Sequence, residues 1–172
     1  MTKINHKYYL FILHSLLPII IGGLFYIAFR SKTLIMFNWF KQIGIENVIF
    51  NIRDKISFFK YLLPNWIYFS LPDGLWIYSF TSFLLIYWDN KFEYCKYWLL
   101  IPFTSSIVVE ILQLLKMFPG TFDIIDLFFL TLGFSLSLII INLKFKKYEK
   151  KHTGSNQINR TFLWIATEKQ II

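Results

Sequence analysis

The sequence predicts an all-α integral membrane protein with four transmembrane helices and one amphipathic helix at the membrane interface. Composition is the first reason: of the 172 residues, 56% are apolar and 21% are aromatic, and the mean hydropathy is +0.50. A soluble domain this apolar could not cover its surface with polar groups. The second reason is that the Lys and Arg residues, which give a net charge of +8, flank apolar segments. This placement is typical of membrane orientation signals, so we expect the lipid bilayer as a partner and no nucleic acid.

Cysteine and histidine give no pattern for a metal or redox site. Cys95 is the single cysteine, which excludes an internal disulfide and a thiolate cluster. His6, His14 and His152 are scattered and form no metal-ligand spacing. We therefore expect no metal and no cofactor.

The first predicted span covers about residues 8–29, which are almost wholly apolar. At about 1.5 Å per residue, this length crosses a hydrocarbon core of roughly 30 Å. The segment lacks the cleavage site of a secretory signal, so we expect it to be retained. Pro18 should bend the helix, and Gly22-Gly23 should let a neighbouring helix approach closely. His14 lies inside the span, and we interpret it as a neutral imidazole bonded to a backbone carbonyl or to another helix.

The next two predicted helices differ in character. Apolar residues recur at steps of three and four over about residues 45–63, which predicts an amphipathic helix lying in the membrane interface. We interpret this helix as an anchor to the interface; the alternative is a lid or a surface for a partner. A second span follows at about residues 72–88. Ser70 and Asp73 have the form of a capping box at its start. Asp73 is therefore either a helix cap or a site residue.

The third predicted span, at about residues 97–115, contains both a proline and an acid. Pro102 should kink it, and the hydroxyls of residues 104–106 can satisfy the freed backbone groups. Glu110 and Gln113 lie three residues apart and so share one helical face. Because apolar residues surround Glu110 on both sides, it is the most deeply placed acid in the chain.

A Pro119-Gly120 turn leads to a fourth predicted span at about residues 124–143. Asp123 and Asp126 lie at its start, where negative charge interacts favourably with the helix dipole, and Thr121 is a candidate N-cap. Asp126 also shares a stripe with Leu130, Gly133 and Ser137, whose small residues predict packing on a neighbouring helix and permit a homo-oligomer. Residues 1–143 thus form a single membrane domain, and residues 144–172 are expected to be a basic, flexible cytoplasmic tail.

Topology is expected to bring the polar residues together. With four spans, the start of the second, the end of the third and the start of the fourth lie at one membrane face. The candidate ligand-binding residues that share this face are Asp73, Glu110, Gln113, Asp123 and Asp126. The N-terminus, the link between the second and third spans (residues 89–96) and the tail together hold 11 of the 18 Lys and Arg residues. This excess of positive charge favours cytoplasmic termini and an outward-facing acid cluster.

The same residues carry a family resemblance. The sets Glu110-x-x-Gln113, Pro119-Gly120-x-x-Asp123-x-x-Asp126 and Leu132-Gly133 resemble the signature of the VanZ-like family of small bacterial membrane proteins. Asp73 and Trp76 fall where that family has an Asp followed by a His. The similarity spans roughly residues 70–137. Three positions depart from it: Thr121, Leu130 and Trp76 replace an Arg, an Asn and a His. The missing Arg removes the natural counter-ion of the acids.

The resemblance implies a multi-pass protein of the bacterial cytoplasmic membrane. The family's namesake is associated with resistance to the glycopeptide teicoplanin. Our first functional hypothesis is a non-enzymatic cell-envelope protein that binds a polar headgroup, a cell-wall precursor or another membrane protein. One alternative is an intramembrane enzyme acting on a lipid-linked substrate, with Glu110 as general acid or base and Asp126 as the ionised partner. Another is a small proton-coupled carrier.

Overall fold

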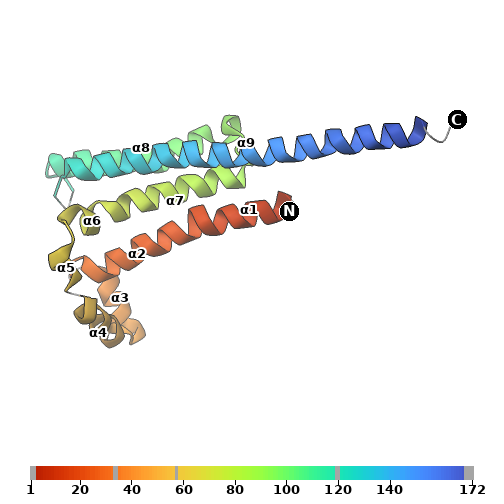
Figure 1. Ribbon diagram of the computed structural model, residues 1–172. Helices are drawn as coiled ribbons and strands as arrows, with labels where there is room; N and C mark the ends of the chain where they lie inside the picture. Colours follow the sequence, from red (N-terminus) through yellow and green to blue (C-terminus); the bar gives the residue numbers. More distant parts are fainter. Residues whose placement is uncertain (1–2, 33–34, 57, 119–120, 169–172) are drawn as a thin grey trace.

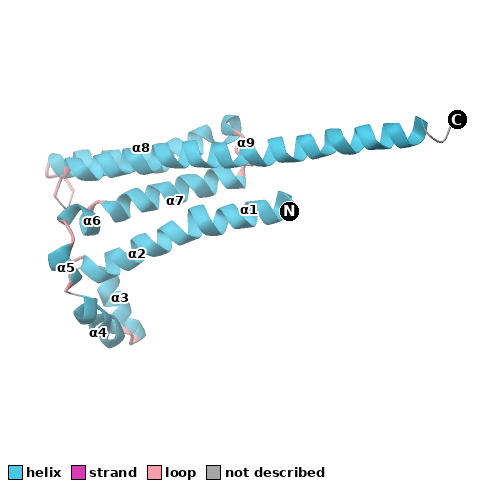
Figure 2. Cartoon of the chain, viewed as in Figure 1, coloured by secondary structure: helices cyan, strands magenta, loops and turns pink. Residues whose placement is uncertain are grey.

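The computed structural model describes residues 3–32, 35–56, 58–118 and 121–168. All regular secondary structure within these ranges is helical (Figure 2). The long helices lie side by side as an elongated bundle, and the start of α1 and the end of α9 point to the same end of it (Figure 1). The predicted Pro119-Gly120 turn lies outside the described residues.

Three helical segments are long and apolar enough to cross a membrane. The first, Ile4–Phe29, joins α1 (Lys3–Phe11), a π-helical turn (Ile12–Leu16) and α2 (Leu17–Phe29). The others are α8 (Phe92–Leu114) and the Ile124–Lys150 part of α9 (Ile124–Glu168). Large apolar side chains of these segments are exposed on the outside of the bundle, among them those of Leu24, Ile101 and Phe128. These features are consistent with a membrane protein.

The predicted number of four spans was wrong, because the second predicted span forms a shorter and more internal helix. This helix, α7 (Leu71–Tyr87), has 17 residues. At about 1.5 Å per residue it is about 26 Å long, short of a hydrocarbon core of roughly 30 Å. Nine of its residues are buried, and it packs between α2 and α9 (Figure 1). The apolar composition of this segment thus reflects burial within the bundle as well as proximity to lipid.

Two glycines set the contact between α7 and α9, the most extensive between any two helices described. A Cβ atom on Gly133 would overlap the carbonyl oxygen of Gly74, and one on Gly74 would lie 2.8 Å from the carbonyl oxygen of Phe129. Leu130 and Ser137 on the same stripe are buried. The prediction that this face of the last span packs on a neighbour is therefore confirmed.

The first span also packs on α7 in the expected way. A Cβ atom on Gly22 would lie 2.7 Å from Nε1 of Trp76, so this glycine permits close approach. The same prediction for Gly23 was wrong, because a Cβ atom there would have no neighbour within 4 Å. His14 Nδ1 lies 2.6 Å from the hydroxyl of Tyr78 on α7, which confirms the interpretation of His14 as a residue bonded to another helix. The π-helical turn that contains His14 immediately precedes Pro18, whose missing N–H interrupts regular α-helical bonding.

The predicted amphipathic helix over residues 45–63 is not one continuous helix. The chain forms α4 (Glu46–Ile56) and the short α5 (Phe59–Leu62), and residue 57 between them is outside the described ranges. Helix α5 ends because Leu63 precedes Pro64, which disfavours a helical conformation at Leu63. The sequence prediction missed α3 (Ile35–Ile43), and α6 (Asn65–Phe69) then leads into α7.

Helix α9 continues to Glu168, well beyond the predicted end of the last span at about residue 143. The Lys-rich sequence after the apolar segment contains good helix formers, so the helix has no local reason to stop there.

Candidate ligand-binding cavity at the acidic end of the bundle

One cavity of about 740 Å³ lies at the end of the bundle where α2 and α8 finish and α7 and α9 begin (Figure 1). All five predicted site residues line it: Asp73, Glu110, Gln113, Asp123 and Asp126. The predicted juxtaposition of these residues is thus confirmed, although α7 is too short to count as a span. The antiparallel arrangement of the helices is sufficient to bring them together.

The cavity has an apolar part as well as a polar part. Its apolar lining comes from α2, α7, α8 and α9 and includes Ile19, Tyr26, Trp76, Ile77, Phe80 and Leu130. Tyr26 and Trp76 stack with ring centroids 5.2 Å apart. Carboxylates and aromatic rings therefore share a single space, which is the composition expected of a pocket for a partly apolar molecule.

Glu110 is the most buried acid of the cavity, with only 8% of its surface exposed. The backbone N–H of Asp123 donates to its carboxylate and so ties the end of α8 to the start of α9. The second oxygen, Oε2, is buried and has no hydrogen-bond partner among the described residues. Because an ionised carboxylate only accepts hydrogen bonds, this atom is free to accept one from a donor that enters the cavity.

The two aspartates at the start of α9 have different roles. Asp123 Oδ1 accepts a hydrogen bond of 2.9 Å from the backbone N–H of Ile125, so Asp123 caps the helix. The expectation that Thr121 could be the N-cap is not met, because Thr121 precedes the first helical residue by three positions. Asp126 is half-buried, and the Ser70 side chain is a hydrogen-bonding neighbour of its carboxylate, while its Oδ1 has no partner of its own within the described part of the chain.

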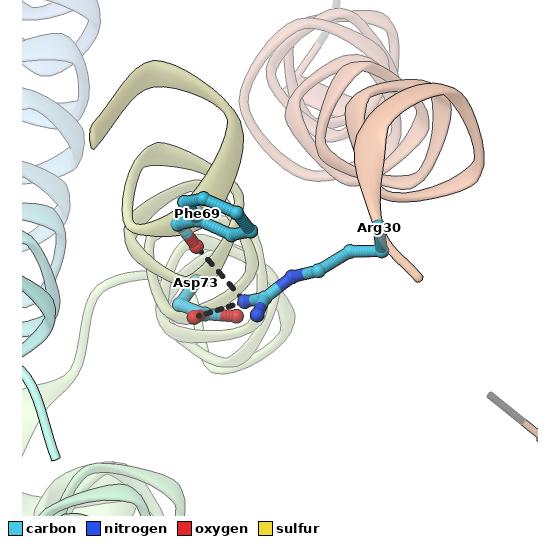
Figure 3. Close-up of polar contacts among 3 residues, drawn as sticks. All are labelled: Arg30, Phe69 and Asp73. Carbon is cyan, nitrogen blue, oxygen red and sulfur yellow. Dashed lines mark hydrogen bonds and ion pairs between the residues drawn. The ribbon is translucent and has the colours of Figure 1, made fainter. Parts of the chain in front are cut away.

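Asp73 forms an ion pair in place of the expected capping box. No side-chain hydrogen bond caps α7 at Ser70. Instead, Asp73 Oδ2 lies 3.3 Å from an Nη of Arg30, the residue that ends α2 (Figure 3). Asp73 thus pairs with Arg30 and lines the cavity, and a ligand-binding role for it stays a prediction.

Arg30 is the site residue that the sequence prediction missed. The same Nη donates a hydrogen bond of 2.9 Å to the carbonyl oxygen of Phe69 (Figure 3). The guanidinium also lies over the rings of Tyr26 and Phe69, at 5.0 and 5.4 Å from their centroids. The sequence contained a signal for this residue. Arg30 directly follows the first predicted span, so helix order places it at the same end of the bundle as Asp73 at the start of the second.

Comparison of the chain with protein-family models, curated proteins and solved structures finds no match. Inference about function therefore depends on the residues of the cavity. Thr121 stands at the position of the Arg in the VanZ-like signature, and Arg30 brings to the acids a counter-ion from a different helix.

Arg53 on α4 holds the end of α2, and with it the position of Arg30. One of its guanidinium nitrogens donates to the carbonyl oxygen of Arg30 at 2.7 Å, and the other donates to the carbonyl oxygen of Ile27. These carbonyls belong to the last turn of α2, where a cation is favourable. Helix α4 therefore helps to fix the helix end that carries the counter-ion.

The charge of the cavity is strongly unbalanced. Its lining contains four carboxylates and one guanidinium, and that guanidinium is already engaged by Asp73 and Phe69. The carboxylates are close enough to interact electrostatically with one another and with Arg30. In the described residues, no group of three or more His, Cys, Asp or Glu side chains has an arrangement that could hold a metal ion.

Proposed function

We propose that this chain is an integral membrane protein that binds the polar end of an amphipathic ligand, such as a lipid or a lipid-linked cell-wall precursor, in the acidic cavity. The observation that carries the proposal is the buried Glu110 Oε2, which has no donor among the described residues and lies in a cavity lined by both charged and apolar or aromatic side chains. A buried polar atom without a partner costs roughly 1–3 kcal/mol, which a bound ligand group would recover.

The size and shape of the cavity support this proposal. A volume of about 740 Å³ lies within the range of roughly 300–1,000 Å³ found for small-molecule pockets. Ile19, Ile77 and Leu130 offer contacts for a hydrocarbon chain, while Glu110 and Asp126 offer acceptors at the polar end. Binding of a molecule with both parts therefore uses the whole cavity, and it requires no catalytic group.

The resemblance to the VanZ-like family supports a role in the bacterial cell envelope. In this proposal the ligand is a component of the envelope, the protein resides in the cytoplasmic membrane, and glycopeptide sensitivity is the cellular readout. The departure at Thr121 does not weaken the proposal, because Arg30 supplies a cation at the cavity.

Replacement of Glu110 by Gln is expected to weaken ligand binding by about 10- to 100-fold. The change keeps the shape of the side chain, but a hydrogen bond to a charged group contributes about 1.5–3 kcal/mol, and about 1.4 kcal/mol corresponds to a tenfold change in affinity. Native mass spectrometry of the full chain can measure which lipids or precursors are retained. The matched control is Glu93→Gln, which removes an exposed carboxylate at the opposite end of the same helix.

Retention of the same molecules by the parent and by Glu110→Gln would contradict the proposal. If the variant also lost its effect on teicoplanin sensitivity while its binding stayed unchanged, the enzymatic or proton-coupled alternatives would be favoured, because they require Glu110 to gain or lose a proton in a step that follows binding.

We further propose that the cavity faces the outside of the cell and that the opposite end of the bundle, toward which the start of α1 and the end of α9 point, faces the cytoplasm (Figure 1). On a Cys95→Ser background, a cysteine at Thr121 is expected to react with a membrane-impermeant thiol reagent in intact cells, and one at Lys147 is not. Thr121 is exposed and lines the cavity, whereas Lys147 is exposed on the distant part of α9. Labelling of Lys147 alone would place the cavity in the cytoplasm and would rule out an extracellular ligand.

A further inference from the structure

We propose that the group recognised by this cavity is an organic cation: a primary ammonium carried by an amphipathic molecule and held between Glu110 and Asp126. This inference rests on the proposed function and specifies the chemistry of its ligand. Three features of the cavity lead to it: the charge of the lining, an orphaned acceptor atom and the aromatic wall.

The charge of the lining disfavours an anion. Four carboxylates and one guanidinium give a formal charge of −3 when all of them are ionised. Arg30 offsets one of these charges, and it is bound through one Nη to Asp73 and to the Phe69 carbonyl, while its buried Nε has no partner among the described residues. A phosphate or carboxylate headgroup would therefore meet unpaired negative charge in a partly buried space, where such repulsion is poorly screened.

One orphaned acceptor favours a donor. Glu110 Oε2 is buried and lacks a hydrogen-bond partner among the residues that the structure describes, whereas the carboxylate of Asp126 has the Ser70 side chain as a hydrogen-bonding neighbour. The Glu110 side chain is more than nine-tenths buried and lines the cavity. An ammonium group has three N–H donors and a positive charge, so it can donate to Glu110 Oε2 and offset the excess negative charge to which Asp126 contributes.

The aromatic wall is suited to the same cation. Trp76 and Phe80 lie four residues apart on α7, line the cavity and are partly exposed. Trp76 is the best aromatic partner for a cation, and its stacking on Tyr26 holds its ring in place. Arg30 already makes cation–π contacts with Tyr26 and Phe69, so Trp76 and Phe80 remain for the ligand.

The experiment compares amphiphiles that share one chain and differ in headgroup. The full chain is placed in nanodiscs of neutral lipid, and binding of dodecylammonium, dodecyl maltoside and dodecyl phosphate is measured by displacement of a fluorescent probe. Ethanolamine, which has the ammonium group but no chain, tests a soluble source. We expect dodecylammonium to bind at least tenfold more tightly than the other three.

The variants connect this preference to the two acids. Glu110→Gln and Asp126→Asn, tested singly, are each expected to reduce dodecylammonium binding at least tenfold, and Glu93→Gln should leave it unchanged. Two isosteric variants are used so that poor folding of one does not decide the result.

Each contrary outcome has a distinct meaning. Equal or tighter binding of dodecyl phosphate or dodecyl maltoside, still dependent on Glu110, overturns the cation and leaves the proposed function standing. Ethanolamine binding as tightly as dodecylammonium retains the cation but overturns a membrane-derived ligand. Binding of none of the four above the level of empty nanodiscs overturns both proposals.

Discussion

Replacement of Gly133 by Ala is expected to destabilise the bundle by about 3 kcal/mol, the upper end of the usual cost of overpacking a core. The added Cβ atom would overlap the carbonyl oxygen of Gly74 and lie 2.9 Å from Cγ2 of Ile77. A backbone carbonyl cannot move aside as a flexible side chain can, so α7 and α9 must separate along their main contact. Thermal unfolding in detergent, together with the amount of protein recovered from membranes, measures this effect.

Gly23→Ala is the matched control for this prediction. Gly23 also lies within a membrane-spanning helix, but a Cβ atom there would have no neighbour within 4 Å. Because Ala favours the helical conformation over Gly, this variant should be as stable as the parent or slightly more stable. Equal melting temperatures for Gly133→Ala and Gly23→Ala would show that α7 and α9 do not pack through Gly74 and Gly133.

Replacement of Arg30 by Met is the second change with a large expected effect. It leaves Asp73 without its counter-ion beside the other carboxylates of the cavity. Removal of one partner of a fully buried pair costs roughly 3–5 kcal/mol, while exposed pairs contribute under about 1 kcal/mol. The Arg30 and Asp73 side chains are 26% and 27% exposed, so we expect an intermediate loss of about 2 kcal/mol.

A double-mutant cycle can separate the ion pair from the other contacts of Arg30. The variant Arg30→Met/Asp73→Asn should recover at least half of the stability that Arg30→Met loses, because the unpaired charge is removed as well. The remaining loss reports the bond to the Phe69 carbonyl and the packing on Tyr26. Strictly additive losses in chemical unfolding experiments would contradict a coupling between Arg30 and Asp73.

The predicted number of spans was wrong because of α7. Residues 72–88 are as apolar as a membrane span, and hydropathy does not distinguish a side chain that faces lipid from one that faces another helix. The structure decides between them, because α7 has the buried position between α2 and α9. The helix was therefore predicted correctly as a helix, but incorrectly as one of four full-length spans.

The candidate site shows the same division between local and distant information. Sequence spacing places Glu110 on one helical face with Gln113, and helix order places both at the same end as Asp73. The capping box predicted from Ser70 and Asp73 was a local pattern, and it does not form. Asp73 instead pairs with Arg30, which lies 43 positions earlier in the chain. Local patterns cannot reveal such competition, since the alternative partner comes from another helix.

The sequence by itself determined the helical class, the apolar spans and the gathering of five polar residues at one end, because these depend on periodicity, length and the order of the helices. Only the tertiary structure decided which acid is paired and which is left without a donor. That distinction depends on the rotation and spacing of packed helices, which the close contact of Gly74 with Gly133 and the reach of Arg30 across to α7 establish.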